Sequence, residues 1–186
     1  MKKLVCGILL SCAALAAPAA AAAQSPVPFA AEGRVGVAFP SGDLDRLANS
    51  GVGFGATLTV QLMPNYGLYG GYSRTEFEME GAADARAIDS GFAVGLTAAY
   101  PWLGTRVMPW LGTGLLFHDL EVRGLSPAEG SSEIGWELGG GLAVVLAPRV
   151  RLTPGISLRT YAAPLPGRSD GRVSYATAGV GLNVAF

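Results

Sequence analysis

The sequence predicts an all-β fold in which eight antiparallel strands run up and down in order and close into a barrel. Three observations predict it. Apolar residues recur at every second position, which is the period of a strand. Eight such segments are joined by connections that are alternately short and long. Charged residues are concentrated in the long connections and are scarce in the segments themselves.

The N-terminal residues have the composition of a secretory signal peptide. Two lysines precede an apolar run at residues 4–15, and three alanines at residues 21–23 form a small-residue cleavage site. A lipoprotein alternative, in which Cys12 carries the lipid, is open from the Leu-Leu-Ser-Cys run that ends there. The domain organisation expected is a signal peptide at residues 1–23, a short linker at residues 24–31 and a barrel domain at residues 32–186.

Composition excludes several classes of function. Removal of residues 1–23 takes away both cysteines and both lysines, so neither a disulfide framework nor thiol chemistry is expected. The single histidine makes a metal centre unexpected. The formal net charge of −1 gives no general attraction to nucleic acid. We therefore expect no metal, no other cofactor and no nucleic-acid partner.

The alternation is clearest in two segments. From Val52 to Leu62 the even positions are Val, Phe, Ala and Leu, and the odd positions are Gly, Thr and Gln. The segment that ends at Phe186 repeats this scheme from Ala178 onward. Six more segments alternate, of which 67–74 and 108–117 are the least regular. The predicted strands are residues 33–39, 52–62, 67–74, 90–100, 108–117, 134–146, 150–159 and the last segment, which ends at residue 186.

The connections place all long loops at one end of the barrel. The short ones are residues 63–66, 101–106 and 147–149, and the long ones are residues 40–50, 75–89, 118–133 and 160–174. Two prolines, Pro109 and Pro154, fall inside predicted strands. Because a closed barrel has no free edge to accommodate a missing N–H, we expect both prolines near the short turns or at a bulge.

Charge decides which face of the strands is inside. The predicted strands contain only five charged residues, namely Arg34, Arg74, Glu137, Arg151 and Arg159. A water-facing sheet surface without charge promotes aggregation, whereas a lipid-facing one requires its absence, because an arginine at the bilayer midplane costs about 2–4 kcal/mol. The apolar face is thus predicted to face lipid. The chain is then a transmembrane β-barrel with short periplasmic turns and long extracellular loops.

Counting positions along each strand places a set of polar side chains in the lumen. The lumen candidates are Arg34, Gln61, Glu137, Arg151, Arg159 and Asn183, together with Tyr161 and Tyr175. Glycines share this face, as expected where an eight-stranded interior is filled by side chains. We expect Glu137 to pair with Arg159 in the outer half of the barrel. Arg74 counts onto the apolar face, at the end of its strand.

Aromatic residues gather near the ends of the predicted strands. At the short-turn end these are Tyr66, Tyr100, Trp102 and Phe186, and at the long-loop end they are Phe39, Tyr72, Phe92, Phe117 and Trp136. Two aromatic girdles are expected where a barrel meets the two membrane interfaces.

Four short stretches carry a resemblance to a known family. They are Arg-Val-Gly-Val-Ala-Phe at 34–39, Pro-Trp-Leu-Gly-Thr-Gly at 109–114, Glu-Leu-Gly-Gly-Gly-Leu at 137–142 and Val-Gly-Leu-Asn-Val-Ala-Phe at 180–186. The chain resembles the small outer-membrane β-barrel family of the OmpX, OmpW and opacity-protein kind. The resemblance implies location in the outer membrane of a Gram-negative-type envelope and a non-catalytic structural or surface-interaction role. A narrow, porin-like channel for small apolar molecules, as in OmpW, is the alternative.

The same resemblance implies partners. They are outer-membrane lipid and lipopolysaccharide, an extracellular partner bound through the long loops, and the barrel-assembly machinery. The C-terminal alternation of Val180, Leu182, Val184 and Phe186 is similar to the signal that this machinery reads.

Two chemical alternatives are weaker. Five acidic residues in the predicted 75–89 loop could bind Ca²⁺ weakly, but their spacing matches no EF-hand loop, so a solvated acidic loop is expected there: Glu76, Glu78, Glu80, Asp84 and Asp89. A lipid A-modifying enzyme would need a nucleophile, a base and an acid. His118 and Asp119 lie at a predicted loop base, and the nearby serines Ser126, Ser131 and Ser132 lie in the loop. We therefore predict an interface histidine and no catalytic residues.

Overall fold

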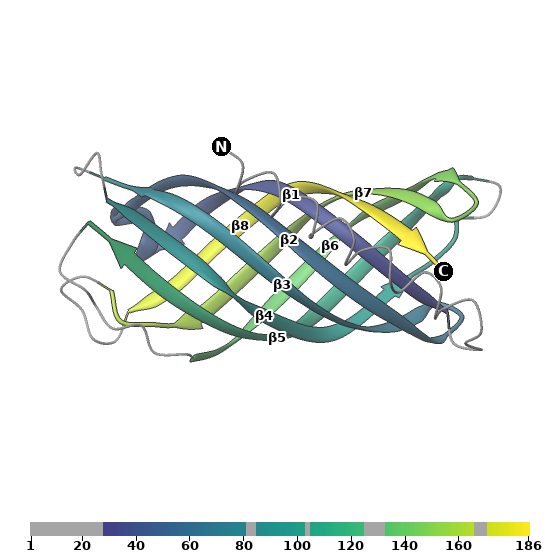
Figure 1. Cartoon of the computed structure of the whole chain (residues 1–186), viewed down its shortest axis with the longest axis horizontal. Coiled ribbons are helices and arrows are strands. Elements are labelled where there is room, and N and C mark those ends of the chain that lie inside the picture. The colour runs from purple at the N-terminus through teal and green to yellow at the C-terminus, as the bar shows by residue number, and fades with distance from the viewer. Residues whose placement is uncertain (1–27, 81–84, 103–104, 125–132, 166–170) are drawn as a thin grey trace, which may run out of the picture.

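The computed structural model describes residues 28–80, 85–102, 105–124, 133–165 and 171–186. Within these residues, eight strands pair in sequence order and close into one antiparallel barrel, which confirms the predicted fold (Figure 1). The strands are β1 (Phe29–Gly42), β2 (Ala48–Met63), β3 (Tyr66–Met79), β4 (Arg86–Ala99), β5 (Val107–Arg123), β6 (Glu133–Ala147), β7 (Val150–Ala162) and β8 (Arg172–Ala185). The predicted signal peptide, Asp84 and the serines at 126, 131 and 132 lie outside the described residues.

Most strands are longer than predicted, and the extra residues lie mainly at the long-loop end. β3 continues to Met79 rather than 74, and β5 continues to Arg123 rather than 117. At the short-turn end, β1 begins at Phe29 and so includes the last three residues of the predicted 24–31 linker. The predicted loops were therefore too long, and several residues assigned to them are paired in the sheet.

A reversal of polarity explains the error. Near the barrel middle, apolar side chains point outward and small or polar ones point inward. Beyond the long-loop girdle the inward positions become apolar, as at Phe77, Leu120 and Val173, all of which are buried. The outward positions become charged, as at Glu76 and Glu121. This is the pattern of a barrel in water, so the strands project beyond the lipid-facing band.

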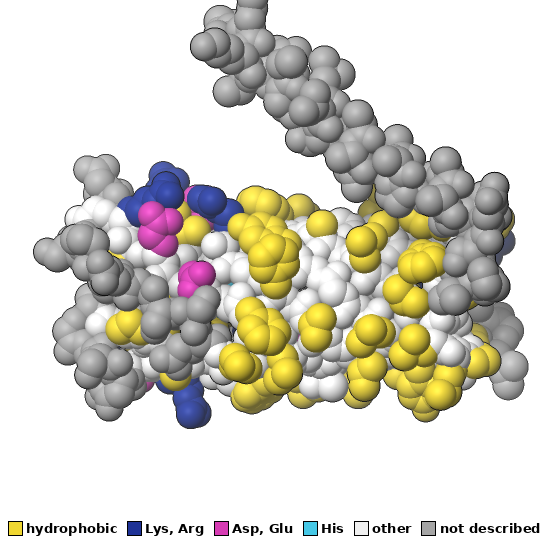
Figure 2. All heavy atoms as spheres, turned by 60° about the horizontal axis from the view of Figure 1, so that its bottom comes forward, with side chains coloured by type: hydrophobic (Ala, Val, Ile, Leu, Met, Phe, Trp, Pro, Cys, Tyr) yellow, Lys and Arg dark blue, Asp and Glu magenta, His cyan; other side chains and the backbone are white. Residues whose placement is uncertain are grey.

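The outer surface shows the two regions directly. Hydrophobic side chains form a broad band over the middle and the short-turn end, and Arg, Asp and Glu side chains gather toward the long-loop end (Figure 2). The predicted long-loop girdle residues are all exposed, and Tyr72 packs edge-on against Phe92, with ring centroids 5.3 Å apart. Arg74 faces outward as counted, at the border of the charged region, where it pairs with Glu76.

Both prolines lie in the half of the strand nearest a short turn. Pro109 is the third residue of β5, and Pro154 is the fifth of β7. The β6–β7 pairing is interrupted between the Gly141–Gly155 and Val144–Leu152 pairs, beside Pro154. This fits a residue that has no N–H to donate to its neighbour.

A hydrophobic core fills the long-loop end of the barrel. It includes Phe77, Leu120, Val122 and Val173 from the strands, and Leu44 from the short helix η1 (Leu44–Arg46). Gly42 has a φ of +65°, a conformation that favours glycine, and it turns the chain from β1 toward η1. Among the described residues, no helix has the length and apolarity needed to cross a bilayer.

Candidate functional site in the barrel lumen

The lumen consists of two layers of buried polar groups and one cavity. The first layer, nearest the long loops, is centred on Asp89, and the second, deeper in the barrel, is centred on Glu137. The cavity occupies the remaining half and reaches the short-turn end, where Pro64 and Asn65 line it.

The first layer joins four strands through one carboxylate. Asp89 on β4 is fully buried and accepts hydrogen bonds from His118 Nδ1 at 2.8 Å, from Tyr161 Oη at 3.0 Å and from Tyr175 Oη. The ring of Tyr175 packs edge-on against Phe77, with centroids 5.3 Å apart. The carboxylate therefore satisfies donors from β5, β7 and β8 across the lumen.

Gly91 lets the first layer form. It lies on the inner face of β4 beside His118, and a Cβ added there would lie 2.7 Å from the His118 Cδ2 atom and 2.1 Å from the Phe117 carbonyl oxygen. Only a glycine leaves space for the imidazole at this point. The His118 Nε2 atom is buried and has no hydrogen-bond partner among the described residues.

The second layer contains the predicted ion pair. Arg159 Nε donates to Glu137 Oε2 at 3.0 Å, and the two residues are directly paired across β6 and β7. Arg159 Nη1 also donates to Ser73 Oγ at 2.8 Å and to Tyr175 Oη at 3.4 Å, which links the two layers. From the opposite wall, Tyr69 Oη donates to Glu137 Oε1 at 2.5 Å.

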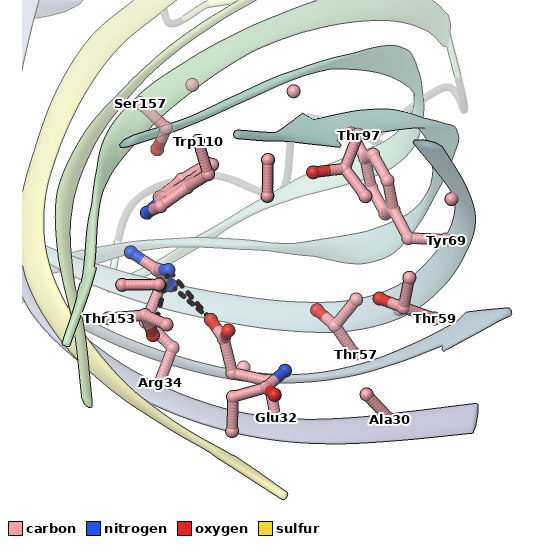
Figure 3. A pocket seen from close by; sticks show the side chains of 18 of the residues that line it. Ala30, Glu32, Arg34, Thr57, Thr59, Tyr69, Thr97, Trp110, Thr153 and Ser157 are labelled. Atoms are coloured by element: carbon pink, nitrogen blue, oxygen red, sulfur yellow. Dashed lines mark hydrogen bonds and ion pairs between the residues drawn. The ribbon is translucent and has the colours of Figure 1, made fainter. Parts of the chain in front are cut away.

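The cavity has a volume of about 390 Å³, and its deep end is closed by the second layer. Glu32, Arg34 and Trp110 form a cluster on its wall (Figure 3). Arg34 donates to Glu32 Oε1 from Nη2 at 2.7 Å and from Nε at 3.0 Å, and its guanidinium lies 5.2 Å from the centre of the Trp110 ring. The distance and the aromatic partner are those of a cation–π contact.

The other three lumen candidates lie near the mouth of the cavity. Gln61 donates to the Pro64 carbonyl oxygen at 2.8 Å, so it binds the adjacent short turn. Arg151 and Asn183 are paired residues of β7 and β8 and both line the cavity. The structure brings Glu137 and Arg159 together but leaves Arg34 with Glu32, a residue that was not among the candidates.

Two expectations for the long-loop end are wrong. His118 is not an interface histidine at a loop base, because it lies within β5, is 1% exposed and contacts Asp89 rather than Asp119. The acidic residues do not form one solvated loop, because Glu76 and Glu78 lie on β3 and Asp89 is buried on β4. The described residues contain no group of three His, Cys, Asp or Glu side chains that could hold a metal.

Sequence reasoning missed several lumen residues that simple counting reaches. Asp89 has the parity of Gly91 and Ala93, and His118 has the parity of Gly114 and Leu116. Both lie just outside the predicted strands, which end at the aromatic girdle. Tyr69 and Ser73 have lumen parity within a predicted strand, but nothing in the sequence indicates which residue each contacts across the barrel.

The comparisons with known proteins agree with this architecture. The family model described as "Outer membrane protein beta-barrel domain" matches residues 7–186. Neisserial surface protein A is 17% identical, with a TM-score of 0.65 over 85% of this chain and 97% of that one. Ail of Yersinia pestis (15% identity, TM-score 0.57, 86% and 98% covered) and OprG of Pseudomonas aeruginosa (13%, 0.55, 86% and 96%) share the fold. No curated protein matches the chain.

Proposed function

We propose that this chain, which belongs to the outer membrane protein β-barrel domain family and lies in the cell outer membrane, has a non-catalytic structural or surface-interaction role. The observation that carries this proposal is the filled long-loop half of the lumen. Most of its buried side chains belong to one hydrophobic core or to the Asp89 layer, and none of Phe77, Asp89 and His118 lines the cavity. The projecting strands and their loops then provide the surface for a partner.

The cavity favours a second candidate, a narrow channel for small apolar molecules. It reaches well into the barrel from the short-turn end, so a channel would need to open the Glu137 layer, the Asp89 layer and the core beyond them. The two candidates differ in whether the barrel conducts or transports.

Planar-bilayer recording separates these candidates. We expect purified protein in bilayers to give no unitary ion conductance. We also expect proteoliposomes to release a trapped, uncharged aromatic solute no faster than protein-free vesicles do. Steady unitary currents, or release that depends on the amount of protein, would contradict a closed structural barrel. An Asp89→Ala variant serves as a comparison, because it weakens one of the two polar layers that close the lumen.

The surroundings of His118 support the non-catalytic part of the proposal. A hydrolase of the Ser-His-Asp type needs a serine hydroxyl on the second imidazole nitrogen. His118 Nε2 has no such partner among the described residues, and the side chain is buried inside the barrel, away from lipid substrates. The Asp89–His118 pair is thus better suited to holding strands together than to activating a nucleophile.

We also propose that the C-terminal alternation acts as the signal for the barrel-assembly machinery. Val180 and Leu182 face outward on β8, and the Phe186 backbone N–H donates to the Phe29 carbonyl oxygen at 2.8 Å, at the seam where β8 meets β1. Deletion of Phe186 should reduce the folded, heat-modifiable protein in outer-membrane fractions several-fold. As the control, residues Met1 to Ala23 are replaced by another signal peptide, and this variant should assemble normally. Normal assembly without Phe186 would remove the support for this signal.

A further inference from the structure

The half of the lumen nearest the short turns contains a cavity lined by charged and aromatic side chains. At about 390 Å³ the cavity is within the range of small-molecule sites in proteins, about 300–1,000 Å³. It reaches the periplasmic end of the barrel, and the Glu137–Arg159 pair lines its deep end. Anything that binds there enters from the periplasm and leaves the same way.

The charges in this compartment do not balance. Arg34 is paired with Glu32, and Arg159 is paired with Glu137. Arg151 also lines the cavity, but among the described residues it has neither a counter-ion nor a hydrogen-bond partner. The mouth of the cavity therefore carries one uncompensated guanidinium, which can pair with a carboxylate in bidentate geometry.

Deeper in, the wall carries an aromatic ring, over which the Arg34 guanidinium lies, and a donor without an acceptor. The Trp110 ring lies against a wall of glycines, because a Cβ added at Gly155 would lie 2.7 Å from its Cζ2 atom and one at Gly141 would lie 3.0 Å from its Nε1 atom. The Trp110 Nε1 atom is buried without an acceptor. Buried donors of this kind are normally satisfied by protein, water or a ligand.

The distance between Arg151 and Trp110 sets the length of a molecule that contacts both residues. Gly155, beneath Trp110, is four residues from Arg151 along β7, and four residues of strand span about 13 Å. A compact inorganic anion cannot reach both places. A molecule with an anionic group at one end and an apolar or aromatic body can.

We propose that the periplasmic half of the lumen binds an elongated organic monocarboxylate, with its carboxylate on Arg151 and its apolar body along the glycine wall beside Trp110. This site goes beyond the surface role proposed above and does not depend on it. It is also separate from a channel, because the ligand enters and leaves at the same end.

Fluorescence of Trp110 tests the site. A Trp102→Phe/Trp136→Phe variant removes the two exposed tryptophans and leaves Trp110 as the reporter. Titration of this protein in lipid nanodiscs with 4-phenylbutyrate should change the Trp110 emission saturably. The uncharged 4-phenylbutanamide, which has the same body, should bind at least about tenfold more weakly, since a charge-assisted contact is lost.

Three further variants locate the carboxylate contact. In the same background, Arg151→Gln should weaken 4-phenylbutyrate binding at least about tenfold, and Asn183→Asp should do the same by placing a counter-ion opposite Arg151 while keeping the arginine. Arg149→Gln is the matched control, because Arg149 lies in the neighbouring turn, is exposed and does not line the cavity.

Heat-modifiable mobility confirms that each variant is folded before titration. Binding that is lost in Arg151→Gln and Asn183→Asp but retained in Arg149→Gln supports the site. The proposal is overturned by an emission that does not saturate, by equal binding of acid and amide, or by equal losses in the Arg151 and Arg149 variants.

Discussion

Replacement of Asp89 by alanine should lower the free energy of unfolding by about 3–5 kcal/mol, one of the two largest effects expected in the chain. The carboxylate is fully buried and is the common acceptor for His118, Tyr161 and Tyr175. Its removal leaves three buried donors without a partner, and each unsatisfied group costs about 1–3 kcal/mol. Urea unfolding in lipid vesicles, followed by tryptophan fluorescence, measures the loss.

Two variants distinguish the hydrogen bonds of Asp89 from its volume and charge. Asp89→Asn keeps the size but replaces one acceptor oxygen by an amide group that donates, so this variant should lose stability to an intermediate degree. Asp119→Ala removes the exposed carboxylate beside His118 and should have little effect, as surface substitutions usually do. Equal stability of the Asp89→Ala and Asp119→Ala proteins would show that the Asp89 layer contributes nothing to folding.

The sequence predicts the barrel well because lipid imposes a simple pattern. Outward positions between the girdles must be apolar, and inward positions must be small or polar, so alternation gives both the strands and their faces. It fails at the long-loop end, where Phe77 points inward and Glu76 points outward on β3. Outside lipid the physical requirement reverses, so the strands continue past the last apolar outward residue, where the alternation predicts that they end.

Some contacts inside the lumen can likewise be predicted from the sequence, and others cannot. Glu137 and Arg159 are equidistant from Pro148 in the short turn, so antiparallel pairing brings them side by side, and the sequence predicts their contact. Tyr69 and Glu137 lie on opposite walls of the lumen, on strands that are not neighbours. Contacts of that kind depend on barrel closure and on the reach of each side chain, which alternation does not describe.

The pair formed by Glu137 and Arg159 should give the second large effect. Both side chains are nearly buried, at 11% and 16% exposure, so removal of either leaves a charge that water can hardly reach. Glu137→Leu takes the acceptor from Arg159 Nε and from Tyr69 Oη, and Arg159→Met leaves the carboxylate with only the Tyr69 hydroxyl as a side-chain donor. Each single variant should lose about 3–5 kcal/mol in the same vesicle assay.

The double variant Glu137→Leu/Arg159→Met shows whether the loss comes from an unpaired charge. Because it removes both charges together, it should be more stable than at least one of the single variants, and the coupling between the two sites should be large. The exposed pair Glu121–Arg123 is the matched comparison, since both side chains are 59% exposed and the same two substitutions there should be additive. Additive losses at Glu137 and Arg159 would mean that the two residues stabilise the barrel separately, through Tyr69 and Ser73. A strong coupling would mean instead that the second layer acts as one unit, which fixes the deep wall of the cavity between β6 and β7.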